Sequence, residues 1–171
     1  MTTDTPLGAI LAGGASRRFG SPKALARLGG ETLAERAWRA LAWCDERLAV
    51  GKADELELPF PLVDDGTAER APIFGVRVAL REARHELCLF LPVDAPLLTE
   101  EALRMLVRER AVPQTGSLPG AYERSVLPEV ENRIGRGDLS LRGLNSRVVA
   151  LDERLLANVN TLEDLVRIER H

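Results

Sequence analysis

Hydrophobic residues gather in short continuous runs at residues 7–12, 48–50, 61–63 and 87–93. Uninterrupted apolar runs of this length are typical of parallel strands that are buried on both faces. Helices are predicted between and after these runs, over residues 33–44, 71–84 and 99–110. The alternation of strands and helices predicts an α/β fold with a parallel sheet covered by helices on both faces.

Threonine residues mark the predicted helix starts. Thr32 is placed to cap the first helix, and Thr161 with Asp164 forms the capping-box pattern of a final helix. Short strands are predicted around residues 121–122 and over 148–151. No internal repeat or second domain is evident, so residues 1–171 are predicted to form one domain.

Polar or flexible residues lie at the ends of three of the predicted strands. Gly13 follows the first run, Asp65 follows the third and Asp94 follows the most hydrophobic one. Ligands of parallel α/β sheets bind beyond the carboxyl ends of the strands. These three positions therefore predict a binding site at one edge of the sheet.

The segment after the first strand combines glycines with cationic side chains. It reads Gly13-Gly14-Ala15-Ser16-Arg17-Arg18-Phe19-Gly20-Ser21-Pro22-Lys23. Adjacent glycines let backbone N–H groups approach an anion, and the serine, arginines and lysine add donors and positive charge. The spacing fits neither a Walker A loop nor the Gly-x-Gly-x-x-Gly fingerprint. We interpret it as a phosphate-binding loop; the alternative is a glycine-rich turn with solvated cations.

Composition narrows the function classes. The 171 residues are 45% hydrophobic and 29% charged with a net charge of −3, which is typical of a globular protein and disfavours a general nucleic-acid surface. No apolar run is long enough to span a membrane, and residues 1–6 lack signal-peptide features, so a cytoplasmic location is expected. Cys44 and Cys88 are expected to be buried thiols, and His85 and His171 make a histidine base or a zinc site improbable.

The pattern Leu11-Ala12-Gly13-Gly14-x-Ser16-x-Arg18-Phe19-Gly20-x-x-Lys23 resembles the signature of the molybdenum cofactor guanylyltransferases. Related cytidylyltransferases and sugar-phosphate nucleotidyltransferases commonly have Leu-Ala-Ala-Gly where this chain has Leu11-Ala12-Gly13-Gly14. Phe19 stands where that family usually has methionine, and Pro22 stands where it usually has aspartate. The segments 71–75, 93–96 and 158–165 resemble further family motifs, with Leu162 in place of the usual proline.

The resemblance implies a three-layer Rossmann-like sandwich with a mostly parallel central sheet, similar to nucleotide-diphospho-sugar transferases. It implies transfer of GMP from GTP to molybdopterin, with release of pyrophosphate and dependence on Mg²⁺. Catalytic roles fall on Lys23, Arg17 and Asp94, with Asp94 as the metal ligand; Arg18 is equivalent to Arg17 on sequence and is the alternative for the phosphate contact. The positions that it assigns to nucleotide, metal or substrate binding are Leu11, Ala12, Gly13, Gly14, Ser16, Lys23, Asp65, Asp94, Asn158 and Asn160.

Several alternatives remain open on sequence. Asp65 and Asp94 are also ordinary turn residues, and Asn158 and Asn160 suit turns and caps. Gly51 stands where the family often has a nucleotide-contacting asparagine, so transfer of CMP or action on a sugar phosphate stays open. A non-catalytic carrier of nucleotide or cofactor is the alternative from another class. Molybdoenzyme apo-proteins and cofactor-biosynthesis proteins are the candidate protein partners; no nucleic acid and no membrane are expected.

Overall fold

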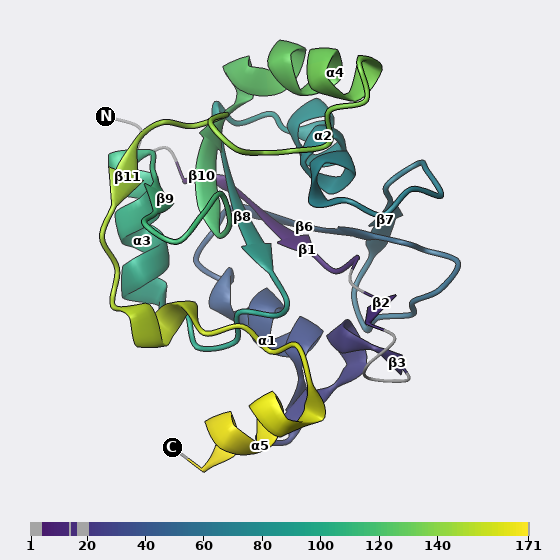
Figure 1. The fold of residues 1–171 in the computed structure, drawn as a ribbon, viewed down its shortest axis with the longest axis vertical. Helices are drawn as coiled ribbons and strands as arrows, with labels where there is room; N and C mark the ends of the chain where they lie inside the picture. Colours follow the sequence, from purple (N-terminus) through teal and green to yellow (C-terminus); the bar gives the residue numbers. More distant parts are fainter. Residues whose placement is uncertain (1–4, 14, 17–20, 171) are drawn as a thin grey trace.

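A five-stranded sheet in the order β10-β8-β1-β6-β7 forms the centre of the molecule (Figure 1). The computed structural model describes residues 5–13, 15–16 and 21–170. The strands of this sheet are β1 (Leu7–Leu11), β6 (Glu46–Gly51), β7 (Leu62–Asp64), β8 (Leu87–Pro92) and β10 (Gly120–Glu123). β1 pairs in parallel with β6 and β8, and β7 pairs in parallel with β6. Only β10 runs antiparallel within the sheet, so the predicted mostly parallel sheet is confirmed.

Helices pack on both faces of the sheet. One face carries α1 (Leu33–Ala40) and α3 (Glu100–Glu109), and the other carries α2 (Pro72–Glu82) and α4 (Leu127–Gly135). The alternation of side chains along β1 divides the core: Ile10 packs with the first pair of helices, whereas Leu7 and Ala9 pack with the second. This arrangement confirms the three-layer α/β sandwich.

Small elements join and extend these layers. Three two-stranded ladders pair β2 (Ala15–Ser16) with β3 (Ser21–Pro22), β4 (Arg27–Leu28) with β5 (Glu31–Thr32), and β9 (Val112–Pro113) with β11 (Val148–Val149). The 3₁₀ helices are η1 (Lys23–Leu25), η2 (Arg124–Val126) and η3 (Glu153–Leu156). The chain closes with α5 (Leu162–Glu169), which contributes Leu165 to the core on the α1 side.

The sequence predicts the N-terminal caps of the helices correctly, but it predicts the C-terminal end of the first helix less well. Thr32 and Thr161 both form complete capping boxes, as predicted. The predicted end of the first helix at Cys44 is wrong, because α1 ends at Ala40 and the chain turns through residues 41–45 to enter β6. The predicted strand over 148–151 is also shorter: β11 stops at Val149 and pairs with β9 outside the central sheet.

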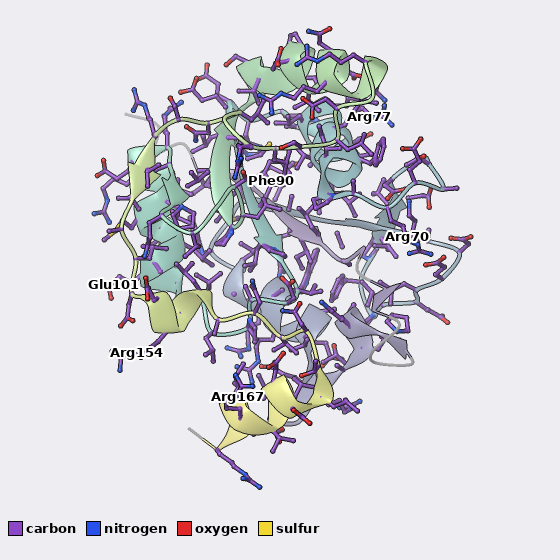
Figure 2. The ribbon with its side chains drawn as sticks, in the orientation of Figure 1. Arg70, Arg77, Phe90, Glu101, Arg154 and Arg167 are labelled. Carbon is purple, nitrogen blue, oxygen red and sulfur yellow. The ribbon has the colours of Figure 1, made fainter. Side chains whose placement is uncertain are left out.

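The interior is apolar on both sides of the sheet. The Phe90 and Tyr122 rings meet edge to face at 5.8 Å, and the Tyr122 hydroxyl donates a 2.6 Å hydrogen bond to the Ser117 carbonyl. Figure 2 shows Phe90 inside the molecule, with Glu101, Arg154 and Arg167 along its outline. Cys44 and Cys88 are free buried thiols, as expected. Within the described residues, no helix combines the length and apolar character needed to cross a membrane.

Candidate active site

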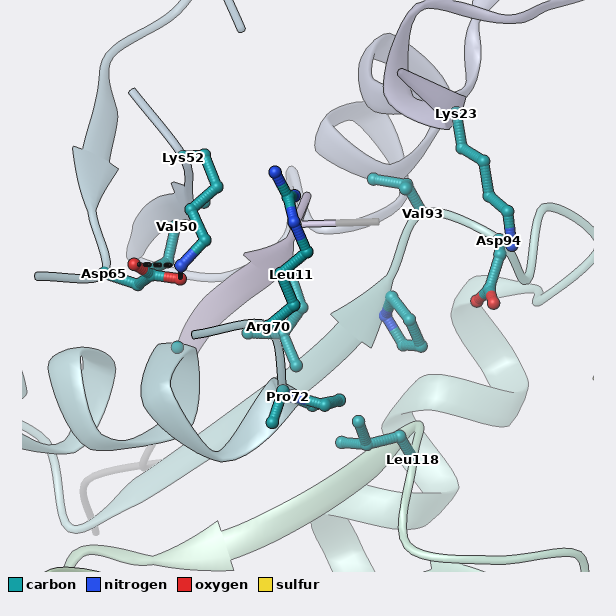
Figure 3. A pocket seen from close by; sticks show the side chains of 15 residues that line it. Leu11, Lys23, Val50, Lys52, Asp65, Arg70, Pro72, Val93, Asp94 and Leu118 are labelled. Carbon is teal, nitrogen blue, oxygen red and sulfur yellow. Dashed lines mark hydrogen bonds and ion pairs between the residues drawn. The ribbon is translucent and has the colours of Figure 1, made fainter. Parts of the chain in front are cut away.

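A pocket of about 340 Å³ lies beyond the carboxyl ends of β1, β6 and β8 (Figure 3). Residues from these strand ends form its walls, together with the loop before α2 and the start of α2 itself. Its lining residues are Leu11, Gly13, Lys23, Val50, Gly51, Lys52, Asp65, Arg70, Ala71, Pro72, Gly75, Pro92, Val93, Asp94 and Leu118. The position at the carboxyl edge of a parallel sheet is the one predicted from Gly13, Asp65 and Asp94.

Lys23 and Asp94 occupy one end of the pocket. The Lys23 Nζ donates a 3.0 Å hydrogen bond to Asn160 Oδ1, and the Asp94 carbonyl accepts a 2.7 Å hydrogen bond from the Val159 N–H. Lys23 belongs to η1 and Asp94 follows β8, so the segment before α5 holds both of them from the C-terminal part of the chain. These contacts hold the Lys23 ammonium and the Asp94 backbone at the same end of the pocket.

The Asp94 carboxyl group is half-buried, and this burial raises its pKa above the ordinary value of 3.8. The positive charge of Lys23 acts in the opposite direction and lowers the pKa, but burial is the larger effect. The described residues contain no cluster of three or more His, Cys, Asp or Glu side chains suited to a metal. A single carboxylate at an open pocket that also holds an ammonium group is a donor set that fits Mg²⁺, because this ion binds one or two protein carboxylates and completes its coordination with phosphate oxygens and water.

Lys52 and Asp65 form a buried ion pair at another part of the pocket wall. Lys52 Nζ lies 2.8 Å from each Asp65 carboxylate oxygen, and the two side chains are only 8% and 7% exposed. The same ammonium also donates to the carbonyls of Thr67, at 2.5 Å, and Glu69, at 2.7 Å. The pair therefore ties the end of β6 to the loop that leads into α2.

Arg70 lies on that same loop and reaches into the pocket between the two lysines (Figure 3). Its guanidinium forms an ion pair with Glu55, on the loop after β6. Neither Lys52 nor Arg70 was among the sequence-predicted site residues. Lys52 immediately follows the last residue of β6, so the rule that identified Gly13 and Asp94 by their place after a strand also applies to it.

The structure brings most of the predicted site residues into this region. Leu11, Gly13, Lys23, Asp65 and Asp94 line the pocket, and Asn160 reaches it through Lys23. Ala12 borders a smaller neighbouring cavity. Asn158 is exposed and does not line the pocket. Gly14, Arg17 and the Ser16 side chain lie outside the described residues.

Comparison with known proteins shows the family to which this chain belongs. The model of the MobA-like NTP transferase domain matches residues 8–153. A protein of Aquifex aeolicus named probable molybdenum cofactor guanylyltransferase is 31% identical, with 93% of this chain and 88% of the relative covered. One of the same name from Rhodopirellula baltica is 35% identical, with 93% and 89% covered.

Solved structures agree with this comparison at the level of the fold. The crystal structure of molybdopterin-guanine dinucleotide biosynthesis protein A from Archaeoglobus fulgidus matches with a TM-score of 0.78 at 22% identity. The match covers 95% of this chain and 96% of that one. The family model spans most of the chain and the pocket residues from Leu11 to Leu118. The chain therefore belongs to the MobA-like NTP transferase family and is a nucleotidyltransferase.

Proposed function

We propose that this protein transfers GMP from GTP to molybdopterin, producing the guanine dinucleotide form of the cofactor and pyrophosphate. The observation that carries the proposal is the placement of Lys23 and Asp94 together at the carboxyl edge of the sheet, in a chain whose relatives are named molybdenum cofactor guanylyltransferases. In this reaction a phosphate oxygen of molybdopterin attacks the α-phosphorus of GTP. The bond from the α-phosphorus to the bridging oxygen breaks, and pyrophosphate leaves.

Lys23 supplies the positive charge in this proposal. Its ammonium group is held at the pocket by Asn160, and it offsets negative charge that develops on the phosphates during transfer. Asp94 is proposed to hold Mg²⁺, which when bound screens the phosphate charge and orients the phosphate oxygens. Arg17, with Gly14 and Ser16 of the same loop, is proposed to contact the β- and γ-phosphates.

The opposite end of the pocket is proposed to receive the nucleoside. Leu11, Ala12 and Gly13 offer backbone groups to the base and ribose, and Asp65 offers a carboxylate acceptor to guanine. Asn158 and Asn160 are proposed to help form the molybdopterin side of the site. The contact of Asn160 with Lys23 supports a direct link between acceptor binding and the proposed catalytic lysine.

The test is pyrophosphate release with Mg²⁺ and molybdopterin, measured separately with GTP, CTP, ATP and UTP. Release with GTP, lost in Lys23→Ala and Asp94→Ala, is the expected result. Preference for CTP would replace the guanylyl assignment with a cytidylyl one. Tight GTP binding without release from any nucleotide would instead support a carrier or another phosphate acceptor.

Location and partners follow from the same proposal. An enzyme that acts on a soluble pterin cofactor is expected in the cytoplasm. The dinucleotide cofactor that it produces would be inserted into molybdoenzyme apo-proteins. Apo-molybdoenzymes and other cofactor-biosynthesis proteins are therefore the proposed protein partners. Co-purification of a molybdoenzyme with this chain tests that part of the proposal independently of turnover.

A further inference from the structure

The chain contains only two lysines, Lys23 and Lys52, and both line the same pocket. Arginine is used at every other basic position apart from the two histidines. Figure 3 shows the lysines on opposite sides of the pocket, Lys23 near Asp94 and Lys52 against Asp65. An ammonium group is a compact charge with three donors, whereas a guanidinium is a larger planar fork, so the two residue types are not interchangeable at a confined site.

The Lys52 ammonium has no proton left for a ligand. Its three N–H groups are matched by Asp65 Oδ1, the Thr67 carbonyl and the Glu69 carbonyl. Its positive charge is balanced by the Asp65 carboxylate at 2.8 Å. This end of the pocket is therefore unsuited to a phosphate group, in contrast to the Lys23 end.

The Asp65 carboxylate keeps acceptor capacity. Its Oδ1 accepts from Lys52 and also from the Thr67 N–H, at 3.3 Å. Its Oδ2 lies 2.8 Å from Lys52 Nζ, but the three ammonium protons are already used by other acceptors. Among the described residues no other donor bonds Oδ2, so this oxygen can accept a hydrogen bond from a ligand in the pocket.

The backbone around Asp65 is fixed by the same network. The Asp65 N–H donates to the Gly51 carbonyl at 3.0 Å, which extends the β6–β7 ladder by one step. Lys52 ties the following residues, Thr67 and Glu69, to the same point. The carboxylate is thus held in one orientation by its main chain and by its partner.

We propose that Lys52 is the positioning residue for base selection, which holds the Asp65 carboxylate oriented so that it accepts from adjacent N–H donors of a purine. This inference rests on the proposed use of GTP. Guanine presents the N1–H and the N2 amino group side by side, whereas adenine presents an unprotonated N1 that a carboxylate repels. Hypoxanthine keeps the N1–H but lacks the amino group. ITP therefore measures the effect of losing one of the two adjacent donors.

The test measures dissociation constants of GTP, ITP and ATP with Mg²⁺ and without an acceptor. In Lys52→Met we expect GTP affinity to fall by about 10-fold or more, ATP affinity to stay nearly constant and the GTP-to-ITP ratio to approach one. Lys23→Met is the matched control, because it removes the other lysine of the pocket. It should weaken all three nucleotides alike and keep their ratios.

A second variant guards against loss of folding. Removing one partner of a buried ion pair leaves an uncompensated charge, whereas removing both is often tolerated. Lys52→Met combined with Asp65→Asn should therefore melt closer to the wild type than Lys52→Met alone and should also lose base discrimination. Lys52→Arg keeps the charge but not the three-way geometry, so we expect it to restore discrimination only in part.

The outcomes separate this inference from the proposed function. If Lys52→Met or the double variant folds and keeps the wild-type GTP-to-ATP ratio, the positioning role of Lys52 is wrong. Equal weakening of all three nucleotides by Lys52→Met would likewise overturn it and assign Lys52 a structural role. If the wild type discriminates among nucleotides as expected but releases no pyrophosphate with molybdopterin, the proposed function fails while the role of Lys52 stands.

Discussion

Lys23 and Asn160 are 137 residues apart in the sequence, and the Lys23 ammonium donates a 3.0 Å hydrogen bond to the Asn160 side-chain oxygen. The neighbouring Val159 N–H bonds the Asp94 carbonyl, so one short segment holds both charged residues of that end of the pocket. The Thr161–Asp164 capping box anchors this segment, since Asp164 Oδ2 accepts from the N–H groups of Asn160 and Thr161. The C-terminal helix is thereby connected to Lys23, the proposed catalytic lysine.

The first prediction concerns Asn160. Asn160→Ala should lower kcat/KM for GTP about 10-fold, because the Lys23 ammonium loses the partner that orients it. Lys23→Ala should lower kcat/KM about 100- to 1000-fold. In the double variant the losses should not add, since Asn160 acts through Lys23. Steady-state kinetics on the four proteins give the coupling directly.

Asn132→Ala is the control for this cycle, because Asn132 is an exposed asparagine of α4 that lies outside the pocket lining. Fully additive losses for Asn160 and Lys23 would mean that Asn160 contacts substrate by itself instead of positioning the lysine.

The second prediction concerns the stability effect of Asp94. Burial raises the pKa of this carboxyl group, so its ionised form destabilises the folded protein at neutral pH. Asp94→Asn should therefore increase the free energy of unfolding by about 1 kcal/mol while it abolishes transfer. Urea titration and the pyrophosphate assay measure the two effects.

Asp64→Asn gives the opposite sign and serves as the control. Hydrogen bonds from the Ala53 and Gly66 N–H groups lower the pKa of Asp64, so its ionised form stabilises the fold. That contribution is present at neutral pH and is lost as pH falls through the lowered pKa. Destabilisation by Asp94→Asn at neutral pH would contradict the assignment of burial as the dominant effect.

The third prediction concerns the pH dependence of activity. Because the ionised Asp94 is the proposed metal ligand, kcat/KM should decline as pH falls through its pKa, which lies above 3.8. Neutralising Lys23 removes the cation that opposes this shift, so Lys23→Met should move the acid limb to higher pH. Residual activity can be followed with a coupled pyrophosphate assay across the acid range. An acid limb that moves to lower pH in Lys23→Met would refute the assignment.

The fourth prediction concerns Gly75, at the pocket wall in α2. A methyl group there would lie 2.8 Å from Leu11 Cδ2 and 3.6 Å from Val50 Cγ1, and both residues line the pocket. Gly75→Ala should displace Leu11, cost about 1–3 kcal/mol of stability and raise the KM for GTP. Gly135→Ala is the control, because nothing lies within 4 Å of its added methyl group. Unchanged KM and stability in Gly75→Ala would mean that Leu11 repacks freely.

The fifth prediction concerns the two cysteines. Burial raises the pKa of both Cys44 and Cys88 to about 12, so almost no thiolate forms at mildly alkaline pH. A thiol reagent should react with the folded protein only as fast as it opens, and with both thiols at once in denaturant. Rapid labelling of the native protein, followed by mass spectrometry, would show that one of the thiols is accessible without unfolding.

The pattern of apolar runs was sufficient to predict the class of fold. Runs such as residues 87–93 are typical of a strand buried on both faces, and helices between successive strands are typical of parallel crossovers. The same pattern placed Gly13, Asp65 and Asp94 at strand ends, and the structure brings them to one pocket. Local chemistry also fixed the caps at Thr32 and Thr161, because a cap depends on residues three positions apart.

The features that only the tertiary structure decided depend on contacts between residues that lie far apart in the sequence. The end of α1 at Ala40 reflects the turn that the chain needs before β6, and β11 ends early because its partner is β9. In the sequence, nothing distinguishes Lys52 from an ordinary loop lysine. The pairing of β6 with β7 places its side chain against Asp65 and buries it. The contact of Asn160 with Lys23 likewise requires the fold to return the C-terminal segment to the first loop. Hydrophobic periodicity specifies which face a residue takes, whereas its partner across the molecule depends on how whole elements pack.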